Sequence, residues 1–188
     1  MNDTYDTSKR KRTLSVLVAN EAGVLSQVSR LFSRKGYNIE SLAVGTTVNP
    51  AISRMTIEVM ADDQQTELMC NQLRKLLLVH SVKLLEPAKS IRRELLMIKI
   101  KTNSNEDRNE IIQIVNIFRG SIIDVCSKTL TLSLIGDEGK NEAALTLLKP
   151  FGITELVRTG IIALERGQYT IDEETKEKGE FDYGKHVL

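Results

Sequence analysis

Two asparagines stand at the ends of one amphipathic segment, within VANEAGVLSQVSRLFSRKGYNIESL (residues 18–42). Asn20 precedes a turn that contains Gly23, and Asn38 follows the segment. Each asparagine side chain offers both a hydrogen-bond donor and an acceptor. The first N–H groups of a helix that starts near Val24 have no acceptor within the helix, and their dipole favours a carboxylate. The stretch therefore predicts an uncharged site for a zwitterion, which carries an ammonium and a carboxylate.

A purely structural interpretation of the same residues stays open. Asn20 can cap the helix, and Gly23 can serve only to make the turn. Asn38 can hold a left-handed conformation after Gly36. In this interpretation no ligand is needed, and the residues alone do not decide between the two hypotheses.

No group of residues suited to catalysis can be assembled elsewhere in the sequence. His80 lies in an expected strand and His186 near the C-terminus, and neither has a cysteine or carboxylate at metal-ligand spacing. Cys70 and Cys126 lie in apolar patterns rather than in CxxC pairs, which favours free thiols in a reducing cytoplasm. Neither G-x-G-x-x-G nor G-x-x-x-x-G-K-[ST] occurs. We therefore expect no catalytic residues, no metal site and no cofactor on this chain.

Charge and composition exclude several classes of partner. Lys and Arg total 26 against 25 Asp and Glu, a net charge of +1, and aromatic residues make up only 4%. This balance argues against binding to nucleic acid or to an anionic membrane. No apolar run approaches the roughly 18 residues of a membrane span, and the polar start MNDTYDTSKRKR lacks the apolar region of a secretory signal. We expect a cytoplasmic protein, or a plastid one if the source is photosynthetic.

The elements that position the two asparagines follow from hydrophobic periodicity. Their order is strand, helix, strand, strand, helix, strand. The first helix carries Val24, Leu25, Val28, Leu31 and Phe32 on one face, and the second carries Met69, Leu73, Leu76 and Leu77. The expected bounds are 13–19 for the first strand, 24 to Gly36 for the helix, 37–48 and 51–61 for a hairpin, about 65–77 for the second helix and 79–86 for the last strand.

The same order begins again after Pro87. The expected elements are a strand at 91–101, a helix at 107–118, strands at 120–127 and 129–136, a helix at 138–149 and a final strand at 153–165. GYNIE (residues 36–40) and GSIID (residues 120–124) occupy the same place in the two halves, as an internal repeat requires. The fold class is therefore α+β, with two ferredoxin-like βαββαβ domains.

The expected domain boundaries are a flexible arm at 1–12, a first domain at 13–87, a second at 88–167 and a polar tail at 168–188. A two-layer unit of this size leaves one sheet face without helices. Because the first strand is apolar on both faces, we expect a second subunit to cover the open face. The sequence thus predicts a homodimer through the first domains.

The stretch that contains the two asparagines closely resembles the regulatory (small) subunit of acetohydroxyacid synthase, also called acetolactate synthase. The resemblance covers roughly residues 13–167 and rests on LSVLVANEAGVLSQVSRLFSRKGYNIESLAVG (14–45), SRMTIEV (53–59), IFRGSIIDV (117–125) and TGIIALERG (159–167). It implies an N-terminal ACT domain that senses a small molecule and a C-terminal ACT-like domain. Two departures, Gln27 where many members carry Arg and Ala22 where others carry Ser, leave the implied ligand contacts in place.

The resemblance also implies a function. Such a chain is not a catalyst: it activates a catalytic large subunit, which carries thiamine diphosphate, magnesium and FAD, and it confers allosteric feedback inhibition by a branched-chain amino acid, usually valine. The implied effector residues are Asn20, Gly23, Val24 and Leu25 of one subunit and Asn38 and Ile39 of the facing subunit. The C-terminal domain is the candidate for contacting the catalytic subunit. Two alternatives remain: a free-standing ACT-domain sensor that regulates another protein, and an enzyme with its site at the domain interface.

Overall fold

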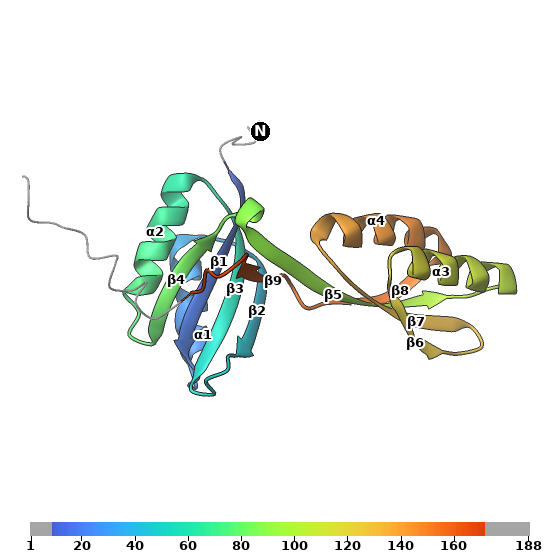
Figure 1. The fold of residues 1–188 in the computed structure, drawn as a ribbon, viewed down its shortest axis with the longest axis horizontal. Helices are drawn as coiled ribbons and strands as arrows, with labels where there is room; N and C mark the ends of the chain where they lie inside the picture. Colours follow the sequence, from blue (N-terminus) through green and yellow to red (C-terminus); the bar gives the residue numbers. More distant parts are fainter. Residues whose placement is uncertain (1–8, 172–188) are drawn as a thin grey trace, which may run out of the picture. The chain divides into compact units, whose positions relative to one another are not determined.

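The computed structural model describes residues 9–171 of the chain, and these form two compact units (Figure 1). The first unit comprises the described residues up to Ile91 together with those from Ala163 onward, and the second comprises Arg92–Ile162. Predictions that concern residues 1–8 and 172–188, including most of the polar tail and His186, lie outside the described residues. No helix in the described part of the chain is long and apolar enough to cross a membrane.

The first unit has the predicted order of elements. These are β1 (Arg10–Ala19), α1 (Val24–Lys35), β2 (Ile39–Thr46), β3 (Ile52–Ala61), α2 (Asp63–Arg74) and β4 (Val79–Leu85). The sheet order is β2-β3-β1-β4, and β1 runs antiparallel to both of its neighbours. Both helices lie on one face of the sheet (Figure 1). The alternate residues Leu14, Val16 and Val18 of β1 form the centre of the core beneath them.

Strand β1 begins at Arg10, three residues before the predicted start, so Arg10–Arg12 do not belong to a flexible arm. These residues pair in register with Val59–Ala61 of β3. The side chains of Arg10 and Arg12 both donate to Asp63, the first residue of α2. The basic residues expected in a flexible arm are therefore held by pairing with β3 and by the carboxylate of Asp63.

The prediction of the second helix was wrong at its C-terminal end. Helix α2 ends at Arg74 rather than near Leu77, and Leu77 is largely exposed instead of lying on the apolar face. Its start is well defined, because Asp62 and Gln65 form a reciprocal capping box. No glycine or proline marks the true end of the helix, so local sequence offered no stop signal.

The face of β1 that points away from the helices is buried within the single chain, at Thr13, Ser15 and Leu17. Lys83 of β4 lies opposite Ser15 and shares this face. Its ammonium forms an ion pair with Glu165 and donates to the carbonyl oxygen of Thr170 at 3.4 Å. A returning segment of the same chain therefore lies on the face that we expected a second subunit to cover. Burial of β1 on both faces does not by itself require a dimer, which stays a prediction.

The second unit repeats the architecture. Its elements are β5 (Ser90–Lys101, from Arg92 onward), α3 (Asn105–Ile117), β6 (Ser121–Val125), β7 (Thr129–Gly136), α4 (Glu138–Leu148) and β8 (Ile153–Arg158). The strand order is β6-β7-β5-β8, again with both helices on one face (Figure 1). Single 3₁₀ turns, η1 (Pro87–Lys89) and η2 (Lys149–Phe151), precede β5 and β8. The sequence TLTLSL (129–134) alternates leucine with Thr or Ser and predicts one buried face of β7, which is confirmed because Leu130, Leu132 and Leu134 are buried.

Two details of the second half differ from the prediction. The sequence predicts one apolar stripe on α4, formed by Ala144, Leu145, Leu147 and Leu148, yet the side chain of Leu147 is 50% exposed. The final strand expected at 153–165 is two strands, β8 and β9 (Ile162–Glu165), and β9 pairs with β5. The break falls at Gly160, whose φ of 77° is left-handed and cannot continue a strand.

The two glycines of the repeated motif serve different purposes. Gly36 ends α1 with a φ of 70°, which is the left-handed cap that glycine favours. Gly120 is needed for space, because a Cβ at this position would lie 2.3 Å from Cδ2 of Leu134 and 2.9 Å from the carbonyl oxygen of Ser133. The Arg119–Gly120 corner therefore brings β6 close to β7.

Candidate effector site

Asn20 holds the corner between β1 and α1, but it does not cap the helix. Its side-chain amide donates to the carbonyl oxygen of Pro50 at 2.9 Å, and its side-chain oxygen accepts from the hydroxyl of Ser53 at 3.1 Å. Its backbone N–H donates to Ala51 at 2.7 Å. Asn20 thus ties the corner to the hairpin between β2 and β3. The interpretation of Asn20 as a helix cap was wrong.

Gly23 is the residue that starts α1, with φ 88° and no side-chain cap. A Cβ built on Gly23 would meet no heavy atom within 4 Å, so the corner is open within one chain. The positive φ, rather than crowding, is what favours glycine at this position. An added side chain would therefore project into the space in front of the first turn of α1.

Helix α1 begins differently from the three other α-helices of the described chain. Asp62, Ser104 and Asp137 cap α2, α3 and α4 through side-chain oxygens, and each of these helices carries an acidic residue in its first turn. Helix α1 has neither a side-chain cap nor an acidic residue in its first turn. Its first N–H groups and its positive dipole end therefore lack the local negative partner that the other helices possess.

Val24 and Leu25, the first two residues of α1, face different ways. Val24 is buried in the core, whereas the side chain of Leu25 is 45% exposed beside the corner. Leu25 was predicted on the buried face together with Val24. Its exposure makes Leu25, rather than Val24, the apolar side chain that a ligand at this corner can contact.

Asn38 and Ile39 lie at the other end of α1. Asn38 is exposed, and its amide donates to the carboxylate of Glu40 at 2.7 Å. Arg119 is the one non-glycine residue with positive φ in the described chain, so Asn38 does not hold a left-handed conformation and that structural interpretation was also wrong. Ile39 opens the edge strand β2 and is half-buried.

A single chain does not bring the predicted site residues together. Helix α1 has 12 residues, which at about 1.5 Å per residue separates its ends by about 18 Å. Asn20, Gly23 and Leu25 cluster at its start, whereas Asn38 and Ile39 lie beyond its end. A small zwitterion cannot reach both groups within one chain.

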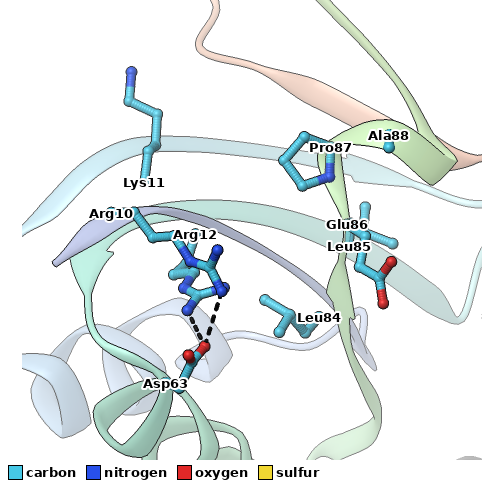
Figure 2. A pocket seen from close by; sticks show the side chains of 9 residues that line it. All are labelled: Arg10, Lys11, Arg12, Asp63, Leu84, Leu85, Glu86, Pro87 and Ala88. Atoms are coloured by element: carbon cyan, nitrogen blue, oxygen red, sulfur yellow. Dashed lines mark hydrogen bonds and ion pairs between the residues drawn. The ribbon is translucent and has the colours of Figure 1, made fainter. Parts of the chain in front are cut away.

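The first unit contains a cavity of about 520 Å³ that the sequence did not predict (Figure 2). It lies at the start of β1, at the other end of the strand from the α1 corner. Arg10, Arg12 and Asp63 line one wall, and Leu84 to Ala88 line the other. The two guanidinium groups share one oxygen of Asp63, at 3.1 Å for Arg10. The hydrogen bond from Arg10 is the main cause that lowers the pKa of Asp63. These ion pairs join β1 to α2 and identify no ligand.

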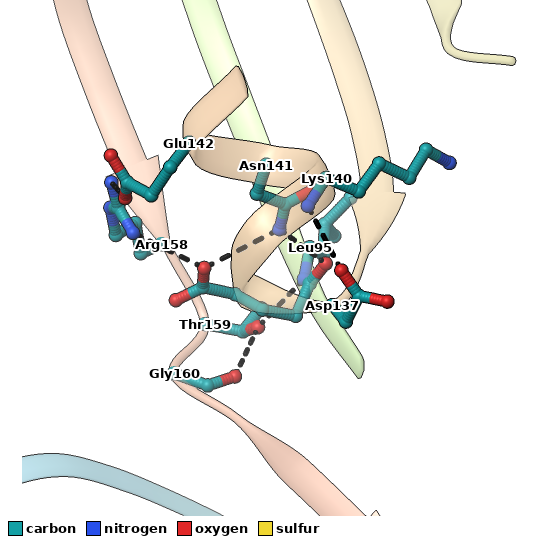
Figure 3. Close-up of polar contacts among 9 residues, drawn as sticks. Leu95, Asp137, Lys140, Asn141, Glu142, Arg158, Thr159 and Gly160 are labelled. Atoms are coloured by element: carbon teal, nitrogen blue, oxygen red, sulfur yellow. Dashed lines mark hydrogen bonds and ion pairs between the residues drawn. The ribbon is translucent and has the colours of Figure 1, made fainter. Parts of the chain in front are cut away.

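The second unit contains a polar cluster around Asn141 of α4, which is fully buried (Figure 3). The Asn141 amide donates to the backbone oxygen of Glu94 at 3.3 Å and to its carboxylate at 3.4 Å. Arg158 of β8 bridges the carboxylates of Glu94, at 3.3 Å, and Glu142, at 2.6 Å. The cluster links α4 to β5 and β8, which is a structural role.

The residues considered for other chemistry form no metal-ligand cluster within the described part of the chain. Cys70 is buried, and burial raises the pKa of its thiol, while Cys126 is exposed. No group of three or more His, Cys, Asp or Glu residues that could hold a metal occurs between residues 9 and 171. The geometry of the described residues therefore points to the α1 corner as the candidate site.

Comparison with known proteins identifies similar families and relatives. Residues 14–81 match a model described as the AHAS small subunit-like ACT domain, and residues 93–167 match one described as the small subunit of acetolactate synthase. The chain is 48% identical over 158 residues to the probable acetolactate synthase small subunit of Methanothermobacter thermautotrophicus, covering 84% of this chain and 94% of that protein. It is 46% identical over 168 residues to the acetolactate synthase small subunit of Aquifex aeolicus, covering 89% and 87%.

A solved structure agrees with this similarity. The crystal structure of the acetolactate synthase small subunit from Thermotoga maritima aligns with a TM-score of 0.80 at 38% identity, covering 85% of this chain and 99% of that one. The α+β fold with two βαββαβ units predicted from the sequence is therefore confirmed.

Proposed function

Because the chain belongs to the acetolactate synthase small-subunit family, we propose that its first unit binds a branched-chain amino acid, valine, and thereby inhibits the catalytic subunit. Members of this family are regulatory, non-catalytic subunits of an enzyme of branched-chain amino acid synthesis. The observation that carries the proposal is the start of α1, which is open and has neither a side-chain cap nor an acidic residue in its first turn.

The α1 corner suits the carboxylate of the effector. The first N–H groups of α1 donate to it, and the dipole of the helix favours its charge. Gly23 leaves room for the carboxylate to approach the backbone closely. Asn20, held by Pro50 and Ser53, keeps the corner in shape while its own amide oxygen stays near the ligand's ammonium.

The remaining contacts come from a second chain. Asn38 and Ile39 lie about 18 Å from the corner along α1, so a complete site forms when the end of α1 in one subunit faces its start in the other. The isopropyl group of valine then rests between Leu25 of one chain and Ile39 of its partner. A shared effector site is therefore a reason to expect a dimer of first units, whereas the burial of β1 is not.

Inhibition requires the effector to favour one arrangement of the dimer over another. A ligand held by two chains meets this requirement, since its contacts exist only when the two α1 helices are correctly juxtaposed. The second unit transmits the change to the catalytic subunit. That subunit holds thiamine diphosphate, magnesium and FAD, and this chain binds none of them. Both subunits act in the cytoplasm.

Replacing Gly23 with Asp tests the proposal. The new carboxylate projects into the corner and repels the effector's carboxylate, so valine inhibition of the reconstituted enzyme is lost while activation of the catalytic subunit remains. Gly167→Asp is the matched control, because Gly167 also has a positive φ, of 74°, and nothing within 4 Å of its Cβ position. Unchanged valine sensitivity of Gly23→Asp would show that the corner is not the site.

A further inference from the structure

The second unit carries an apolar patch on the sheet face that has no helices. In β5 the residues Leu96, Ile98 and Ile100 are fully buried beneath α3 and α4. Because side chains alternate along a strand, Leu95 and Met97 point to the opposite face. Met97 is 42% exposed there.

Strand register makes this patch continuous. Leu95 lies opposite Ile135 of β7, and Met97 lies opposite Val157 of β8. Ile135 is 59% exposed and Val157 is 55% exposed. The apolar patch, defined as Leu95, Met97, Ile135 and Val157, therefore spans three neighbouring strands.

The surroundings of the patch are polar and include charged groups, among them the exposed Arg93 of β5 on the same face. Ser133 and Thr131 of β7 border it on the same face. Lys99 and Glu155 lie opposite each other beside it and form an ion pair at 3.0 Å. An apolar centre with a polar rim is the usual composition of an interface between proteins that also exist apart.

The equivalent face of the first unit is closed. Thr13, Ser15, Thr56 and Ser81 are all buried there, and Lys83 is engaged by Glu165 of the returning segment. The same architecture thus has a covered sheet face in one unit and an exposed one in the other. Exposed apolar clusters of this kind on a soluble chain mark interaction sites.

We propose that the apolar patch is the surface by which this chain docks onto its catalytic subunit. The inference rests on the proposed function, because the family assigns this partner, and it deepens that function by naming the surface. A patch of four apolar side chains with a polar rim is less uniformly apolar than the interface of an obligate homodimer. An apolar centre inside a polar rim is the composition of a standard interface, which buries about 800 Å² on each partner. Because the centre of the patch is apolar, burial of apolar area drives the association.

Ile135→Glu and Val157→Glu test the patch in the full chain. Each places a charge at the centre of the interface and weakens binding to the catalytic subunit about tenfold or more, as measured by calorimetry or sedimentation. Leu147→Glu is the matched control, because Leu147 is 50% exposed in the same unit but lies on α4, on the other side of the sheet. Val157→Thr keeps the side-chain shape and also weakens binding, so the test does not depend on how the glutamate variants fold.

The outcomes separate the docking surface from the proposed function. Loss of binding to the catalytic subunit by the patch variants, with valine binding and self-association unchanged, supports the docking surface. Wild-type binding by the well-folded Val157→Thr and Ile135→Glu chains overturns it and leaves the proposed function intact. Loss of self-association in the chain alone also overturns it, because the occupant is then a second copy. Failure of the wild-type chain to bind either the catalytic subunit or valine refutes the proposed function instead.

Discussion

Replacing Gly120 with Ala will destabilise the second unit. The added methyl carbon would stand 2.3 Å from Cδ2 of Leu134 and 2.9 Å from the carbonyl oxygen of Ser133. Leu134 is buried in the core, and the Ser133 oxygen belongs to the backbone of β7, so neither atom can move aside freely. The Arg119–Gly120 corner must shift away from β7 to accommodate the methyl group.

The magnitude follows from two opposing effects. Overpacking of a filled core costs about 1–3 kcal/mol, and the loss of glycine's freedom in the unfolded chain returns about 0.4–1 kcal/mol. We therefore expect a net loss of about 1–2 kcal/mol, which for a domain of this size lowers Tm by about 5–15 °C.

The assay is thermal and urea unfolding of the full chain, in which the unfolding transition of the second unit is followed. Gly139→Ala is the control, because Gly139 lies in α4 and its nearest heavy atom, in Asp137, is 3.7 Å from the Cβ position. That variant gains up to about 1 kcal/mol from helix propensity. A Gly120→Ala chain that unfolds at or above the wild-type temperature would refute the steric reasoning.

Two further predictions concern titratable groups. Asp63→Asn removes the shared partner of Arg10 and Arg12. In the folded chain the hydrogen bond from Arg10 is the main cause that lowers the pKa of Asp63. The stability that Asp63 contributes is therefore present above the unfolded pKa of about 3.9 and is lost as pH falls through the lower folded value. Acid titrations should therefore show wild type and variant converging below about pH 4, with a smaller difference at high salt, and a constant gap at all pH values would contradict this. Cys126 should react with iodoacetamide in the native chain well before Cys70, whose thiol is buried and has a raised pKa; equal labelling rates by mass spectrometry would contradict the burial.

The sequence predicted the elements well where periodicity and glycine act locally. Val28, Leu31 and Phe32 of α1 and the alternating leucines of β7 are buried as expected, and Gly36 ends α1. These features follow from contacts within a few residues along the chain, which is the range over which hydrophobic patterns are informative.

The sequence failed where distant residues decide the outcome. Arg10–Arg12 join β1 because β3 and Asp63 lie beside them. Asn20 bonds to Pro50 and Ser53 across the hairpin, a pairing that no local cap pattern reveals. The covering of the first sheet by the segment that begins at the end of β9 likewise depends on residues about 80 positions apart in sequence, since Lys83 forms an ion pair with Glu165.

The residues of the candidate site stay a prediction from the sequence, and the structure adds their geometry within one chain. The resemblance and the chemistry of asparagine single out the α1 corner as the candidate site, and only the structure separates Leu25, which is exposed, from Val24, which is buried. The length of α1 then assigns the six predicted residues to two groups. Sequence spacing alone cannot say whether the two groups meet, because in the proposed site they meet between two chains.

The central claim, that one effector site needs two chains, is tested most directly by mixing two defective variants. Gly23→Asp spoils the corner and Asn38→Ala spoils the facing residue, so each variant alone should bind no valine by calorimetry. In a mixed dimer one site receives both defects and the other receives none, and equal mixing then restores about a quarter of the wild-type number of sites. A mixture that remains without valine binding would place the whole site within one chain and contradict the account.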